Sequence, residues 1–112
     1  MSLEITVSEM KRVHLLEANG RVDSLSANQL AEALNGVIDE GHNQLVIDLG
    51  DVEYMSSAGL RELVAALKRV HKVNGDLRLA NPSERVMEVL ELAGLDTIFK
   101  IYPTQVEAVG SF

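Results

Sequence analysis

The stretch DLGDVEYMSSAGLRELVAALKRV, residues 48–70, runs from the end of an apolar segment into an amphipathic helix. The apolar segment, residues 44–49 (QLVIDL), has the nearly continuous hydrophobic character of a strand that is covered on both faces. A helix is predicted over residues 57–72, because apolar side chains recur there at helical spacing: Leu60, Leu63, Val64 and Leu67. Two adjacent hydroxyls, Ser56 and Ser57, lie at the junction, and the function of the chain depends on what they do.

Outside this stretch, the hydrophobic periodicity switches repeatedly between strand and helix patterns. Strand patterns occupy four further segments, the first two joined as a hairpin by a turn within residues 8–12: residues 3–7, 13–20, 76–80 and 97–102. Helix patterns occupy two long segments and a short terminal one that Thr104 and Glu107 could cap: residues 26–41, 81–95 and 104–107.

The ends of the two long helices carry capping signals. Ser26 and Gln29 have the spacing of a capping box, and Asn81 is a predicted N-cap for the later helix. Gly41 and Gly94 suit the left-handed conformation that ends a helix.

The order of these elements predicts the fold class. It is strand, strand, helix, strand, helix, strand, helix, strand and a weak final helix, which favours an α/β fold with a mixed four- to five-stranded sheet, parallel central strands and helices packed against it. Residues 1–112 are expected to form one domain. Crossovers between parallel strands are right-handed, so the loops after the strands gather along one edge, where sites are common. The serine pair lies in such a loop.

Composition excludes several classes of function. A net charge of −7 disfavours nucleic-acid partners, and the absence of cysteine excludes thiolate metal sites and a cysteine nucleophile. No apolar run approaches the roughly 20 residues that cross a bilayer, and residues 1–13 lack the features of a secretory signal. The expectation is a cytoplasmic protein without membrane insertion, cofactor or metal.

Three roles are open to the serines. One hydroxyl could cap the helix, which is worth about 1 kcal/mol. A catalytic serine is disfavoured, because Tyr54 and Met55 stand where a nucleophile elbow has glycine. A modification site is the third role, since a phosphate at a helix N-terminus faces unpaired N–H groups and changes the surface by about −1.5 to −2 charges.

An acidic cluster precedes the serines and could suggest a divalent ion: Asp48, Asp51 and Glu53. Calcium loops have more oxygen ligands at closer regular spacing, so a solvated surface is the favoured interpretation.

Three blocks of the sequence resemble the STAS domain family, whose bacterial single-domain members are anti-sigma factor antagonists. The middle block, residues 45–70, is similar to the family signature, and two flanking blocks resemble the earlier and closing parts of the domain: residues 19–34 and 74–104. The resemblance implies a regulatory protein rather than an enzyme. In the antagonists, the unphosphorylated protein binds an anti-sigma factor that is also a serine kinase, phosphorylation releases it, and a serine phosphatase resets the cycle.

Position by position, the resemblance places the phosphoacceptor at Ser57. Ser56 stands where many antagonists have Asp, which makes it a rival acceptor. Asp23 matches an acidic position near the partner surface, and the predicted partner-binding residues are Asp23, Ser56, Ser57, Ala58, Gly59, Leu60 and Arg61.

Two functions therefore remain open: a phosphorylation-controlled partner switch, and a STAS binding module in a transport or signalling complex that is never phosphorylated. If Ala65 and Ala66 both lie outward, the helix also has a flat face for a partner. The edge strand at residues 3–7 could support a weak dimer, so a monomer or weak dimer is expected.

Overall fold

A computed structural model describes residues 3–112. Its elements, in chain order, are β1 (Leu3–Met10), β2 (Val13–Val22), α1 (Ala27–Asp39), β3 (Gln44–Met55), α2 (Ser57–His71), β4 (Asp76–Ala80), α3 (Glu84–Leu92), the 3₁₀ turn η1 (Leu95–Thr97), β5 (Ile101–Tyr102) and α4 (Gln105–Gly110).

The five strands form one mixed sheet in the order β1-β2-β3-β4-β5. The hairpin of β1 and β2 is antiparallel, and every later pairing is parallel. Lys11 and Arg12 form the hairpin turn, and both have positive φ. The structure thus confirms the predicted fold class, including the parallel central strands.

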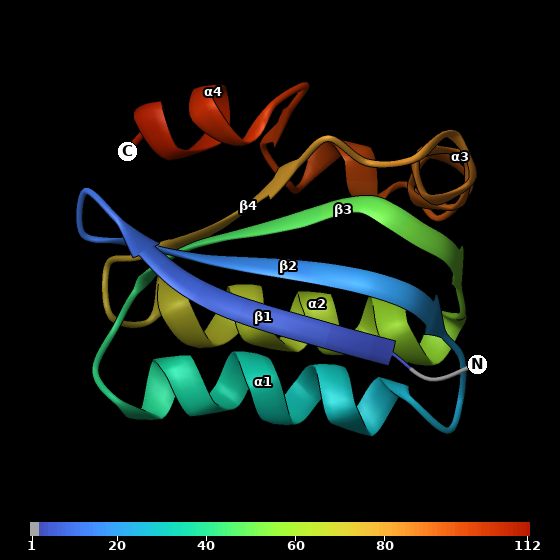
Figure 1. Cartoon of the computed structure of the whole chain (residues 1–112), viewed down its shortest axis with the longest axis horizontal. Helices are drawn as coiled ribbons and strands as arrows, with labels where there is room; N and C mark the ends of the chain where they lie inside the picture. The colour runs from blue at the N-terminus through green and yellow to red at the C-terminus, as the bar shows by residue number, and fades with distance from the viewer. Residues whose placement is uncertain (1–2) are drawn as a thin grey trace.

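Helices cover both faces of the sheet. Figure 1 shows α1 and α2 side by side against one face, with α4 on the opposite side. The larger core lies under α1, α2 and α3, where it includes the fully buried Leu30, Leu63 and Leu90. A smaller core under α4 joins Val46 to Ala108 and their apolar neighbours. The central strand β3 is therefore buried from both sides, as its apolar segment predicted.

Four strand predictions were wrong in extent. The strand predicted at 3–7 continues to Met10, so the turn within residues 8–12 is reduced to Lys11 and Arg12, and the strand predicted at 13–20 continues to Val22. The predicted strand at 44–49 continues to Met55, because β2 keeps pairing with it as far as Val22 opposite Met55. The predicted strand at 97–102 is reduced to Ile101–Tyr102, since η1 occupies its beginning and Phe99 turns into the core.

Two capping predictions were also wrong. The Ser26 hydroxyl donates to the Arg21 carbonyl at 2.7 Å and makes no capping bond to α1, while the Gln29 amide donates to the Leu3 carbonyl at 2.6 Å. Tertiary contacts thus displace the capping box. The N-cap of α3 is Ser83 rather than Asn81, and its hydroxyl accepts from Val86 N at 3.2 Å.

The remaining helix ends match the sequence. Gly41 and Gly94 adopt positive φ of 96° and 73° after α1 and α3. The Thr104 hydroxyl accepts from Glu107 N at 3.1 Å at the start of α4. Within residues 3–112, no helix has the length and apolar character needed to cross a membrane.

Candidate functional site

The serine pair lies at the carboxyl end of β3, where two loops are joined. Ser56 N donates to the Val22 carbonyl at 2.7 Å, which ties the start of α2 to the last residue of β2, where the loop to α1 begins. This bond follows directly from the continued β2–β3 pairing that ends at Val22 and Met55. The loop after β2 and the N-terminus of α2 therefore form one surface.

The two hydroxyls have different roles. Ser56 is the N-cap of α2, has extended backbone angles, and accepts a hydrogen bond from Gly59 N at 3.2 Å. Ser57 is the first residue of the helix and is exposed, whereas Ser56 is half-buried. The capping role thus belongs to Ser56, and the hydroxyl of Ser57 faces solvent beside the positive end of the helix dipole.

The glycine that follows the serines is required by close packing. A Cβ added at Gly59 would lie 2.5 Å from Met55 Sδ and 2.5 Å from Val22 Cγ1. The first turn of α2 therefore sits directly on the ends of β2 and β3, with Leu60 buried and Ala58 half-buried against the core. This packing holds Ser57 in place on the surface.

Asp23 organises the neighbouring loop. Its carboxylate accepts hydrogen bonds from Leu25 N at 3.0 Å and Ser26 N at 2.9 Å. The backbone N–H and the hydroxyl of Ser26 hold the pKa of Asp23 below its ordinary value of 3.8. Asp23 directly follows Val22, whose carbonyl accepts from Ser56 N, and its carboxylate is engaged in a local turn.

A groove begins at Ser57 and runs along α2. It has a volume of about 450 Å³ and separates α2 from the segment that follows α3. Its lining residues are Ser57, Leu60, Arg61, Val64, Ala65, Lys68, Ala93 and Leu95. Ala65 is exposed in this groove, but Ala66 is buried, so the condition for a flat face formed by both alanines is not met. Helical spacing turns residue 66 toward the sheet.

The acidic cluster is dispersed by the structure. Asp48 accepts from Gly50 N at 2.8 Å and from the Gln105 amide at 2.5 Å, so it connects β3 to α4. Asp51 and Glu53 are exposed on β3. Among the residues that the structure describes, no three acidic or histidine side chains gather as a metal site.

The three histidines lie at the other end of the sheet. His14 pairs with Leu45 at the beginning of β3, and its ring stacks on His42 with 3.7 Å between centroids. His71 ends α2 and contacts Asp76 at 3.0 Å. None of them is placed to serve Ser57 as a base.

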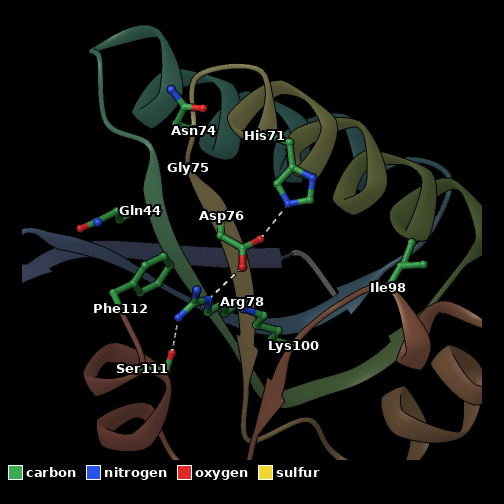
Figure 2. A pocket seen from close by; sticks show the side chains of 10 residues that line it. All are labelled: Gln44, His71, Asn74, Gly75, Asp76, Arg78, Ile98, Lys100, Ser111 and Phe112. Carbon is green, nitrogen blue, oxygen red and sulfur yellow. Dashed lines mark hydrogen bonds and ion pairs between the residues drawn. The ribbon is translucent and has the colours of Figure 1, made fainter.

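A second polar cluster, which sequence analysis missed, surrounds Asp76 at that same end. Figure 2 shows the Asp76 carboxylate between His71 and Arg78, with 2.9 Å to Arg78 Nε. Arg78 also donates to the Ser111 hydroxyl at 2.7 Å and lies over the Phe112 ring. Burial disfavours the charged form of Asp76, but hydrogen bonds from Arg78 and His71 outweigh it and hold the pKa of the carboxyl below 3.8. This cluster attaches the C-terminal helix to β4.

Comparison with known proteins identifies the family. The STAS domain model matches residues 4–108. The chain belongs to the STAS domain family. A STAS relative from Bacillus subtilis, an anti-sigma-B factor antagonist, is 35% identical over 101 residues, which are 90% of this chain and 92% of that protein.

Solved structures agree with the fold. An anti-sigma factor antagonist from Mycobacterium paratuberculosis aligns with a TM-score of 0.91 and 28% identity over 98% of this chain and 93% of that one. The Bacillus protein SpoIIAA, an anti-sigma factor antagonist solved in its phosphorylated form, aligns with a TM-score of 0.76 and 19% identity, covering 96% of this chain and 98% of that one.

Proposed function

We propose that this STAS domain is an anti-sigma factor antagonist controlled by phosphorylation of Ser57. In its unphosphorylated form it binds an anti-sigma factor with serine kinase activity; phosphorylation releases it, and a serine phosphatase restores it. The chain acts in the cytoplasm as a substrate and binding partner, without catalysis of its own. The observation that carries this proposal is the exposed Ser57 hydroxyl beside an N-cap already supplied by Ser56.

The position of Ser57 explains how a phosphate could act without unfolding the domain. A phosphoserine in the first turn faces the free N–H groups and positive dipole end of a 15-residue helix, so the fold tolerates the charge. The surface nevertheless gains about −1.5 to −2 charges at one point. SpoIIAA, which has this fold, has been solved in both unphosphorylated and phosphorylated forms.

Ser56 is the less suitable acceptor. Its hydroxyl already binds Gly59 N, and its backbone N–H binds the Val22 carbonyl. Ser56 is also half-buried, so a kinase would reach it less readily than the exposed Ser57.

Predicted partner contacts surround Ser57. Asp23 lies in the loop joined to the start of α2, Arg61 is exposed one turn further along α2, and Leu60 and Gly59 are buried beneath them. We infer that Ala58, Gly59 and Leu60 shape this surface, whereas Ser57 and Arg61 contact the partner.

The test is intact-mass analysis after incubation with ATP and candidate anti-sigma factor kinases. We expect one added phosphate on the wild type and on Ser56→Asn, which keeps a capping oxygen but removes the hydroxyl, and none on Ser57→Ala. Phosphate that survives in Ser57→Ala and disappears in Ser56→Asn would assign the acceptor to Ser56. No phosphate with any of these kinases would favour the non-phosphorylated binding module.

The binding half of the proposal needs a second measurement. Ser57→Asp should lower affinity for the anti-sigma factor by at least about tenfold, or 1.4 kcal/mol, while the thermal midpoint stays within a few degrees. Calorimetric titration measures the first and thermal unfolding the second. An unfolded Ser57→Asp variant would contradict a switch confined to the surface.

A further inference from the structure

The groove along α2 has an apolar lining that no element of residues 3–112 covers. Leu60, Val64 and Ala65 line it from α2, and Ala93 and Leu95 line it from the segment after α3. Its volume of about 450 Å³ is within the range of ligand and peptide sites. Such a lining favours an apolar occupant.

The charge of the groove is opposite to that of the chain. The whole sequence carries −7, yet the charged lining residues are Arg61 and Lys68, with no acidic residue among the eight. Neither cation takes part in the ion pairs found within residues 3–112. Arg69, on another face of α2, is by contrast held by Asp39 at 2.8 Å. The two groove cations are therefore available to an acidic partner.

The length of the groove along α2 matches about three turns of a partner helix. Residues 57, 61 and 68 follow the helical period and form one stripe along α2, which spans about 17 Å at 1.5 Å per residue. Small side chains at Ala65 and Ala93 allow a partner backbone to approach closely. We propose that the groove binds an acidic amphipathic helix of the partner protein, whose apolar face lies between α2 and Leu95 and whose carboxylates pair with Arg61 and Lys68. This inference rests on the proposed function for the identity of the partner.

The same geometry explains how Ser57 would control the groove. Ser57 and Arg61 are four residues apart, so their side chains are neighbours on one face of α2. A phosphate on Ser57 would pair with Arg61 and bring the formal charge of the groove from +2 to about zero. The modified chain would thus compete with the carboxylates of the partner for the same cation.

The experiment uses two synthetic helical peptides with identical leucine spacing, one flanked by Glu and the other by Lys at the same positions. Fluorescence anisotropy should show that the Glu peptide binds at least tenfold more tightly and that its affinity falls as salt is added. Backbone amide shifts in NMR spectra should map to α2 and residues 93–95. Equal binding of the two peptides, binding of neither, or shifts confined to another face would each overturn the proposal.

A matched pair of variants tests the position of the charge. Lys68→Glu reverses a charge inside the groove, and Lys72→Glu makes the same change just beyond α2 and outside it. We expect Lys68→Glu to weaken Glu-peptide binding at least tenfold and Lys72→Glu less than threefold, with both variants folded by thermal unfolding. Equal losses of affinity in the two variants would show that net charge alone drives binding and would overturn the proposal that the peptide binds in the groove.

This result is separable from the phosphoswitch. If Ser57 is phosphorylated but the Glu peptide does not bind, the groove proposal fails and the switch stands. If the peptide binds at the groove but no kinase modifies Ser57, the groove stands and the switch fails.

Discussion

At the amino end of β4, Asp76 and Arg78 face each other at 2.9 Å, and both side chains are largely shielded from solvent. Along α2, which begins at the carboxyl end of β3, Ser57, Arg61 and Lys68 line an open groove, and their polar groups are left to solvent. The first cluster satisfies its own charges and thereby holds α4 to the sheet. The polar groups of the second cluster are free to bind another molecule. Changes at the first should therefore alter stability, and changes at the second should alter binding.

The largest expected effect comes from breaking the Asp76 cluster. Asp76→Ala leaves Arg78 largely buried without its carboxylate and removes the partner of His71. Because removing one member of a buried pair is strongly destabilising, we expect a loss of about 3 kcal/mol in the free energy of unfolding, measured in urea. A loss below about 0.5 kcal/mol would place this cluster among ordinary surface pairs.

Part of that difference should depend on pH. The folded state holds the pKa of Asp76 below 3.8, so its charged form stabilises the fold above that pH, and the contribution disappears as pH falls through the lower folded value. The stability advantage of the wild type over Asp76→Asn should therefore shrink as pH falls below about 4. Urea unfolding at each pH measures it, and Asp23 contributes equally to both proteins. An advantage that grows on acidification would contradict this assignment.

A smaller stability effect is expected where the functional end depends on packing. Gly59→Ala places a methyl group against Val22 and Met55 at 2.5 Å. Crowding of this kind typically costs 1–3 kcal/mol, and the better helix propensity of alanine offsets about 1. We expect a net loss of about 1 kcal/mol in urea unfolding. Gly36→Ala is the control, because nothing lies within 4 Å of a Cβ there, and it should be neutral or stabilising.

The smallest effects separate the two serines. Ser56→Ala removes the hydroxyl that accepts from Gly59 N and should cost about 1 kcal/mol. Ser57→Ala removes an exposed hydroxyl and should change stability by less than about 0.5 kcal/mol. Thermal unfolding of the two variants measures this difference in stability. A larger loss in Ser57→Ala than in Ser56→Ala would show that Ser57, and not Ser56, caps the helix.

Periodicity predicted the order of the elements, because alternating and helical patterns report which side chains meet the core. Periodicity ended the central strand too early. The polar residues Asp51 and Glu53 interrupt the apolar pattern and favour a loop, although β2 continues to pair with this part of β3. The capping box at Ser26 failed because other carbonyls take its hydrogen bonds: Ser26 bonds to Arg21, five residues earlier, and Gln29 bonds to Leu3, which is far away in sequence but near in space. Local signals cannot include such contacts.

The site was predicted unevenly. The resemblance pointed to Ser57, but only the structure shows that Ser56 is the cap. The groove could not be predicted, because it needs Ala93 and Leu95 to lie opposite α2. The Asp76–Arg78 cluster was also missed, although an Asp and an Arg two residues apart on one strand share a face and could have signalled a pair.

The antiparallel hairpin has a practical consequence for anyone who attaches this protein to a surface or a fluorophore. Since Leu3 lies opposite Gly20, β1 starts at the sheet end where β2 and β3 finish, while Phe112 lies by Arg78 at the far end. A label or immobilisation tether attached after Phe112 would leave the surface around Ser57 accessible, whereas one attached before Leu3 would lie at the same end of the sheet as Ser57.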